Sequence, residues 1–168
     1  WVSRLTIGSR AAFGAVPLVV MRILVTGGAG FIGASLAHRL LSRGDAVVCV
    51  DNLNAYYDPR LKEARLARLA AKPGFSFLQA DIADRAGMQS LFAREAFDCV
   101  VNLAAQAGVR HSLVDPHAYV DANVTGFLNI LEGVRHRGGH LVFASSSSVY
   151  GGNKRLPFRE TDTVDHPV

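Results

Sequence analysis

Cysteines, clustered histidines and long apolar runs are scarce in this 168-residue sequence, and each scarcity narrows the possible functions. The two cysteines, Cys49 and Cys99, stand in apolar runs typical of buried strands, so we expect reduced core residues of a cytoplasmic protein rather than disulfides. The six histidines are scattered without the spacing of metal ligands, so no metal site is expected. The apolar stretch at residues 11–20 is too short to cross a bilayer, and no membrane partner is expected.

Charge is moderate: charged residues make up 19% of the chain, the net charge is +4 and the isoelectric point is near 9.4. A basic balance suits anionic partners such as nucleotides, but the plainer interpretation, a mildly basic surface, is favoured. Basic and aromatic residues do not interleave as in a nucleic-acid platform, so no nucleic-acid partner is expected. One basic run at helical spacing is interpreted as a solvated helix face: Arg60, Lys62, Arg65, Arg68 and Lys72.

Short β-rich runs alternate with helical repeats along the whole chain. The β-rich runs predict strands at 22–26, 46–50, 75–79 and 141–144, and the run at 97–101 leads into a further strand, the fourth along the chain. Helical spacing predicts helices at 31–43, from 58–59 to near 73–74, at 84–94 and at 116–137. This alternation predicts an α/β fold, a Rossmann-type doubly wound parallel sheet with helices on both faces.

Residues 1–20 do not fit this pattern. A strand begins directly after Met21, without a linker or a cleavage region between them. We therefore expect Met21 to be the natural start and residues 1–20 to be a non-native upstream extension. Residues 21–168 then form one domain, which we expect to be incomplete.

A glycine-rich loop joins the first predicted strand to the first predicted helix. Gly27 allows the tight turn, Gly30 lets a pyrophosphate approach the backbone, and Gly33 lets the helix pack closely on the sheet. The N–H groups at the helix start, around Phe31 and Ile32, are expected to bind phosphate oxygens. A glycine motif with a strand before it and a helix after it predicts a dinucleotide site, against the alternative of a turn without a ligand.

An acidic residue at the end of the second strand supplies the other half of this signature. Asp51 is placed to accept hydrogen bonds from the adenosine ribose, and Asn52 stands beside it. A carboxylate here repels a 2′-phosphate, so NAD is favoured over NADP as the cofactor. The alternative is that Asp51 is a plain turn residue.

The ends of the third and fourth strands are also expected to contact the cofactor. Asp81 and Ile82 are placed to reach the adenine, although Asp81 could instead cap the helix that begins near Asp84. Ligands of such sheets bind at the carboxyl edge, where small residues let the backbone approach. The residues expected there after the fourth strand are Leu103, Ala104, Ala105 and Gln106.

Taken together and in this order, these motifs resemble one family. They are the glycine loop, residues 51–53, 81–82 and 103–106, and the run Ala-Ser-Ser-Ser-Ser-Val-Tyr-Gly at 144–151. From Met21 to Val168 the chain resembles the extended short-chain dehydrogenase/reductase family, the NAD-dependent nucleotide-sugar epimerases and dehydratases. Segments 51–59 and 105–110 and the serine run before Val149 are similar to those of the UDP-glucuronate 4-epimerases. His111 departs from that group, in which tyrosine is expected at this position.

The resemblance implies an isomerase in which bound NAD oxidises C4 of a nucleotide sugar and hydride returns to the other face of the 4-keto sugar. By resemblance, Ser146 hydrogen-bonds the reacting oxygen, with Ser148 a close second, and Asn123 lies near the cofactor. Arg110 is our hypothesis for binding the carboxylate of UDP-glucuronate or UDP-galacturonate. The alternatives are a polar loop for the serines, a plain helix residue for Asn123 and a surface arginine for Arg110.

The family's catalytic Tyr-x-x-x-Lys pair does not occur in this sequence, since none of the four tyrosines has a lysine four residues later. The resemblance places this pair, and a substrate domain, beyond Val168, so we expect a fragment of a longer enzyme that is inactive by itself. Family members are often homodimers through a helix pair, to which the helix after Pro116 could contribute.

Two other functions stay open for the longer protein. One is a sugar-nucleotide 4,6-dehydratase or decarboxylase, which Ser147 and Ser148 disfavour because they stand where an acidic pair is expected. The other is a non-catalytic NAD-binding regulator that has kept the cofactor fold and lost the chemistry. The sugar and the direction of epimerisation also stay open.

Overall fold

The computed structural model describes residues 20–164, so the expectation for residues 1–19 lies outside the described residues. A parallel sheet of five strands forms the centre, in the order β3-β2-β1-β4-β5. The strands are β1 Arg22–Thr26, β2 Ala46–Asp51, β3 Phe75–Gln79, β4 Cys99–Asn102 and β5 His140–Phe143. The strand order reverses at β1, and the carboxyl end of such a switch point is where ligands of doubly wound sheets bind.

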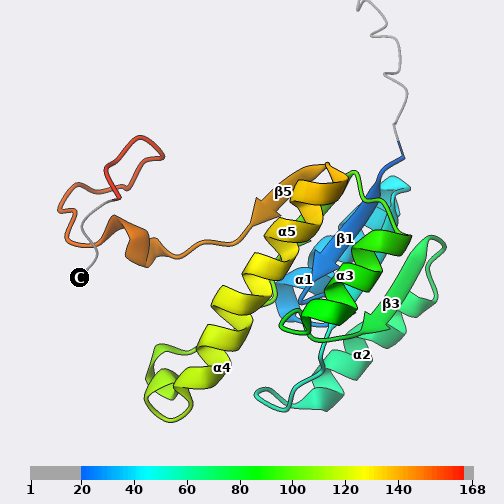
Figure 1. Ribbon diagram of the computed structural model, residues 1–168, viewed down its shortest axis with the longest axis horizontal. Coiled ribbons are helices and arrows are strands. Elements are labelled where there is room, and N and C mark those ends of the chain that lie inside the picture. Colours follow the sequence, from blue (N-terminus) through cyan, green and yellow to red (C-terminus); the bar gives the residue numbers. More distant parts are fainter. Residues whose placement is uncertain (1–19, 165–168) are drawn as a thin grey trace, which may run out of the picture.

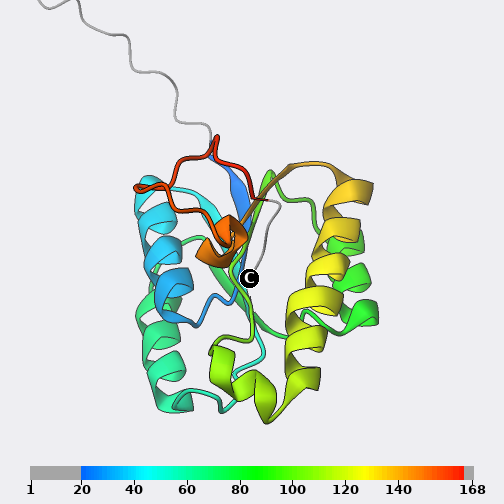
Figure 2. The same cartoon turned by 90° about the vertical axis from the view of Figure 1, so that its left-hand side faces the viewer.

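Helices cover both faces of the sheet, as Figures 1 and 2 show. They are α1 Phe31–Arg43, α2 Pro59–Ala70, α3 Arg85–Arg94, α4 Pro116–Val120 and α5 Phe127–Arg137. Helices α1 and α2 lie on one side and α3 and α5 on the other, with the sheet between them (Figure 2). The predicted doubly wound parallel fold is thus confirmed. Among the helices of residues 20–164, none combines the length and apolar character of a transmembrane span.

Two hydrophobic cores form because successive side chains of a strand point to opposite faces. In β1, Leu24 packs into the core that includes α3 and α5, whereas Ile23 and Val25 pack into the core beneath α1 and α2. Val48 and Cys49 of β2 divide between the two cores in the same way. Burial on both faces explains why these strands read as continuous apolar runs in the sequence.

Local signals define the ends of the helices. Gly44 ends α1 in the left-handed conformation, with φ of 100°, which glycine adopts without a steric penalty. The Asp58 carboxylate accepts a hydrogen bond from the N–H of Arg60 at the start of α2. Asp84 caps α3 by accepting from the N–H of Gly87, so the alternative that Asp81 is the cap of this helix is wrong.

The prediction of one continuous helix over 116–137 is wrong. Helix α4 is followed by a π-helical segment at Asp121–Gly126, and α5 continues from there. Two tertiary contacts accompany the wider turns. The Asn123 side chain binds the backbone of Gln106, and Gly126 packs so closely on Ile82 that an added Cβ would lie 2.6 Å from its Cγ1. Apolar spacing does not encode such contacts, and π turns recur at functional sites.

Two short 3₁₀ turns lie in segments for which the sequence predicted neither a strand nor a helix. They are Val109–Leu113, before α4, and Ser147–Tyr150, after β5. Ser112 Oγ donates to the carbonyl oxygen of Val109 within the first turn, and Ser146 Oγ accepts from the N–H of Ser148 at the start of the second. Short 3₁₀ turns of this kind are common connectors. The segment after β5 projects away from the sheet in Figure 1.

Candidate functional site

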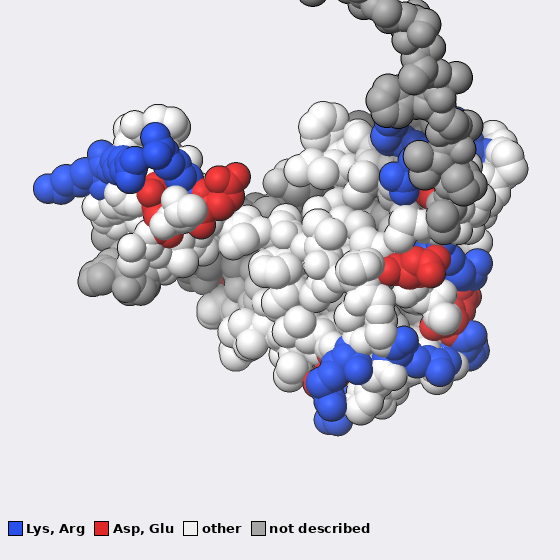
Figure 3. Space-filling view, turned by 90° about the horizontal axis from the view of Figure 1, so that it is seen from above, with Lys and Arg blue, Asp and Glu red and all other residues white. Residues whose placement is uncertain are grey.

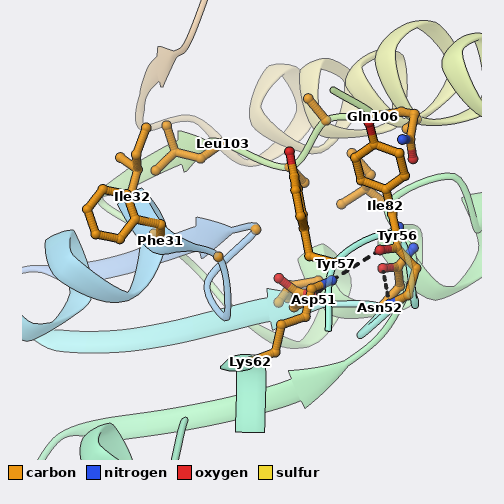
Figure 4. A pocket seen from close by; sticks show the side chains of 18 of the residues that line it. Phe31, Ile32, Asp51, Asn52, Tyr56, Tyr57, Lys62, Ile82, Leu103 and Gln106 are labelled. Atoms are coloured by element: carbon orange, nitrogen blue, oxygen red, sulfur yellow. Dashed lines mark hydrogen bonds and ion pairs between the residues drawn. The ribbon is translucent and has the colours of Figure 1, made fainter. Parts of the chain in front are cut away.

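A pocket of about 440 Å³ lies at the carboxyl edge of the sheet, a volume within the range of small-molecule sites. It opens between the glycine loop, the ends of β2 and β3, and the loop that follows β4 (Figure 4). Nearly all of the residues predicted to bind the cofactor line it: Gly27, Gly30, Phe31, Ile32, Gly33, Asp51, Asn52, Asp81, Ile82, Leu103, Ala104, Ala105 and Gln106. The structure thus brings together, in one cavity, residues that are far apart in the sequence.

The glycine loop is shaped by close backbone contacts that a side chain would block. Gly27 has φ of +66°, and a Cβ there would lie 2.9 Å from the backbone nitrogen of Ala104. A Cβ on Gly33 would lie 2.2 Å from the carbonyl oxygen of Gly27, so α1 starts directly against the turn. Gly30 is the N-cap of α1 and supplies no capping side chain. The first N–H groups of α1 therefore face the pocket as donors for an anion.

Asp51 is buried at the end of β2 and tied into the floor of the pocket. Its Oδ2 accepts a hydrogen bond of 3.1 Å from the N–H of Ala29, which fixes the carboxylate against the glycine loop. Its Oδ1 accepts from the N–H of Leu53 at 2.9 Å and from Lys62 Nζ at 3.2 Å. Leu53 adopts φ of 56°, an uncommon conformation for leucine that turns the chain around the carboxylate.

Lys62 is a pocket residue that the sequence did not reveal. The interpretation of the basic run as a solvated helix face is wrong for this lysine, whose side chain is only 9% exposed. Its ammonium donates to Asp51 and, at 3.2 Å, to Asn54 Oδ1. Arg65, one turn further along α2, also lines the pocket and reaches the carbonyl oxygen of Ala29 at 3.4 Å. The helical spacing predicted that these cations share one face of α2. It did not show that Asp51, from another element, lies beneath Lys62.

The β3 end of the pocket is held by a pair of polar side chains. Asn52 Nδ2 donates to Asp81 Oδ2 at 2.9 Å, and the N–H of Ala83 donates to Asp81 Oδ1 at 2.8 Å. Ile82 packs beside them in the core under α3 and α5. This arrangement places an acidic side chain and an apolar surface together, as an adenine edge and face require.

The loop after β4 is positioned by two side chains that do not line the pocket themselves. Thr26 is fully buried, and its Oγ1 accepts from the N–H groups of Leu103 and Ala104, each at 3.1 Å. Asn123 accepts from the N–H of Gln106 at 2.9 Å and donates to its carbonyl oxygen at 3.0 Å. Asn123 therefore holds the loop rather than facing the cavity. The sequence offered one sign of this role, since Thr26 is a polar residue at the end of an otherwise apolar strand.

Two tyrosines to which the sequence motifs assign no role also line the pocket. The rings of Tyr56 and Tyr57 meet edge to face with centroids 4.8 Å apart, and Tyr56 lies 5.1 Å from His111. Tyr119 extends the cluster, since its ring lies 6.3 Å from that of His111. Desolvation first, and then the neighbouring Tyr119 and Tyr57, raise the pKa of Tyr56 above its ordinary value.

Three predicted substrate and catalytic residues lie away from this pocket. Ser146 and Ser148 belong to the segment after β5, and Ser146 Oγ accepts from the N–H of Ser148 at 3.1 Å. Only Ala144 of that segment lines the cavity. Arg110 is exposed on the 3₁₀ turn before α4 and does not line the cavity either. The structure therefore leaves their roles as predictions.

Charged side chains of both signs share the face drawn in Figure 3, including those of the projecting segment after β5. Within residues 20–164, no group of three or more His, Cys, Asp or Glu side chains gathers as a metal site would need. Cys49 lies behind the glycine loop, and burial raises the pKa of its thiol to about 12, with a smaller contribution from Asp51. Its expected place in the core is confirmed.

Comparisons with known proteins match the chain along most of its length. The family model described as GDP-mannose 4,6 dehydratase matches residues 24–167. The chain is 46% identical over 149 residues to the probable UDP-glucuronate 4-epimerase of Rhizobium meliloti (strain 1021), covering 88% of this chain and 44% of that protein. It is 47% identical over 149 residues to Protein CapI of Staphylococcus aureus, with the same two shares covered.

Among solved structures, the UDP-glucuronic acid 4-epimerase from Bacillus cereus in complex with UDP-glucuronic acid and NAD matches with a TM-score of 0.75 at 33% identity. The match covers 88% of this chain and 46% of that chain. The chain thus spans less than half the length of the relatives it matches.

Proposed function

The chain belongs to the GDP-mannose 4,6-dehydratase family, and we propose that its pocket binds NAD as the cofactor-binding part of a UDP-glucuronate 4-epimerase. One observation carries the proposal. The glycine-rich loop before α1 and a buried acidic residue at the end of β2 line the same cavity, in a chain 46% identical to a protein named as this epimerase. The family membership agrees with the resemblance of the sequence motifs.

The residues of the pocket fit NAD on two geometric grounds. The cradle around Gly27, Gly30 and Gly33 has no room for a Cβ at two of these positions, which is what close approach of a pyrophosphate needs. Asp51, at the end of β2, is where such sheets hold the adenosine ribose. When bound, NAD supplies a hydride acceptor and donor for C4 of the sugar. The chain's own part is to bind and orient the cofactor and to keep its adenosine half in a largely apolar cavity.

The sugar nucleotide is the finer part of the proposal. The sequence segments 51–59 and 105–110 and the names of the relatives favour UDP-glucuronate and UDP-galacturonate. In the whole protein Ser146 then orients the reacting oxygen, with Ser148 as its alternative, and Arg110 binds the carboxylate. Docking of the segment after β5 against the pocket would bring the serines to the cofactor.

A homodimer is proposed for the whole protein, with α4 and α5 at the interface. Four large apolar side chains repeat at helical spacing along this pair and are 39–61% exposed: Val120, Val124, Leu128 and Leu131. An apolar stripe of this kind favours a helix partner. A second copy of the same stripe satisfies it by two-fold symmetry.

The test is the reaction of the whole protein with UDP-glucuronate, followed by NMR of the sugar anomeric protons. We expect conversion to UDP-galacturonate without net consumption of NAD. A decarboxylated pentose would instead establish the decarboxylase alternative, and a 4-keto-6-deoxy sugar formed from UDP-glucose in a parallel reaction would establish the dehydratase alternative. NAD binding without any turnover of nucleotide sugars would favour the regulator and overturn the enzyme proposal.

A further inference from the structure

The ribose end of the pocket holds a buried ion pair rather than a lone carboxylate. The side chains of Lys62 and Asp51 are 9% and 6% exposed, and Lys62 Nζ lies 3.2 Å from Asp51 Oδ1. In Figure 4 the lysine side chain runs from α2 toward Asp51. A buried cation beside the acidic residue changes the charge that a bound nucleotide meets at this point.

The hydrogen bonds around Asp51 limit what it can offer to a ribose. A carboxylate has about four acceptor positions. Ala29, Leu53 and Lys62 occupy three of them among the described residues. One position is therefore left for a ribose hydroxyl, although the ribose presents two neighbouring hydroxyls.

Lys62 can serve the second hydroxyl. An ammonium has three hydrogens to donate. Asp51 and Asn54 accept two of them within the described residues. The third is free to point into the cavity that Lys62 lines. One hydroxyl of the diol then donates to Asp51 while the other accepts from Lys62.

We propose that Lys62 is a cofactor-specificity residue, which binds the adenosine ribose jointly with Asp51 and weakens the exclusion of a 2′-phosphorylated cofactor. The proposal rests on the proposed binding of NAD. An unpaired carboxylate repels a 2′-phosphate, but the ammonium at 3.2 Å offsets that repulsion and attracts the phosphate directly. Arg65, on the same side of the pocket, adds a second cation.

The experiment compares the dissociation constants of NAD and NADP by calorimetry on the full chain and four variants. In K62M we expect NAD binding to weaken about tenfold, the loss of one hydrogen bond from a charged donor. NADP binding should weaken about a hundredfold, so the dissociation constant of NADP divided by that of NAD (the NADP-to-NAD ratio) rises about tenfold. D51N should lower this ratio, because it removes the negative charge that repels the 2′-phosphate and leaves the positive charge of Lys62.

Two variants separate specificity from folding. K62R keeps the positive charge, so its NADP-to-NAD ratio should stay within about twofold of the wild-type value. That change is small beside the tenfold rise expected when K62M removes the charge. Arg68→Met removes an exposed cation from the same helix and should change neither constant. K62Q serves in place of K62M if the latter fails to fold, with the same expected widening.

The outcomes distinguish this inference from the proposed function. A wild-type chain that binds neither nucleotide overturns the proposed NAD site itself. A wild-type chain that binds NAD, with an unchanged NADP-to-NAD ratio in K62M or K62Q, overturns the role of Lys62 alone. Widening that also appears in R68M would show a general charge effect and would overturn it as well.

Discussion

Asp51 joins the backbone of the glycine loop to the charge of helix α2. Its carboxylate accepts from Ala29, Leu53 and Lys62, so one buried side chain fixes the turn, the following loop and the helix. Loss of this carboxylate leaves the Lys62 ammonium buried without its counter-charge. Buried pairs broken in this way are among the most destabilising single changes.

Asp51→Ala is accordingly expected to lower the free energy of unfolding by about 3 kcal/mol, because it strands a buried cation and two backbone N–H groups. Urea titration followed by circular dichroism measures the change. Asp58→Ala, at an exposed helix cap, is the comparison and should lower the free energy of unfolding clearly less than Asp51→Ala does. Equal losses in the two variants would contradict a structural ion pair at Asp51.

Cys49 offers a second test at this scale. Its thiol, with a pKa of about 12, remains protonated at pH 8, and the thiolate is the reactive form. We expect Cys49 to resist a thiol-specific dye in the native chain and to react fully in urea. Rapid labelling of Cys49 in the native state, located by peptide mapping, would contradict its burial behind the glycine loop.

Some residues of the pocket could be predicted from the sequence, and others could not. The glycines, Asp51 and Asp81 could be placed because backbone geometry ties each to the end of a strand. Lys62 could not, since a cation on a helix faces solvent unless an acidic partner lies beneath it, and that partner comes from another element. Thr26 and Asn123 act through backbone groups of the β4 loop, a contact that spacing does not encode.

Elements are predicted more reliably than their interruptions. All five strands lie within two residues of the predicted runs, and helices cover both faces as expected, because buried parallel strands give continuous apolar runs. The break between α4 and α5 was missed, since the apolar stripe continues through Asp121–Gly126 as if the helix did. The wider turns coincide with long-range contacts to Gln106 and Ile82.

The same stripe supports a prediction about assembly. Val124 and Leu128 are 61% and 54% exposed on the α4–α5 pair. Replacing both with glutamate should convert a dimer of the whole protein to a monomer, because buried charges at a helix interface are strongly unfavourable. Light scattering after gel filtration measures the mass. Ala64→Glu with Ala67→Glu, two exposed positions of α2, is the matched charge control, and a dimer surviving in the first variant would contradict this interface.

At the scale of the whole molecule, the fold and the pocket are set by residues 20–164, while the chain spans 44% of the length of a named relative. The sequence predicted the family because its motifs follow the carboxyl ends of successive strands, which one sheet edge brings together. The proposed sugar-nucleotide substrate rests on the names of relatives, and the serines proposed to contact it lie away from the pocket. The cofactor site is therefore the part of the account that this chain itself can test.

Calorimetric titration of the full chain with NAD tests that claim most directly. We expect saturable binding at one site per chain, which is lost in Gly33→Ala because the new Cβ would lie 2.2 Å from the carbonyl oxygen of Gly27. Ser35→Ala, on the exposed side of the same helix, should bind NAD as the wild type does. Absence of binding in a folded wild-type chain, or binding retained unchanged in the glycine variant, would contradict the account.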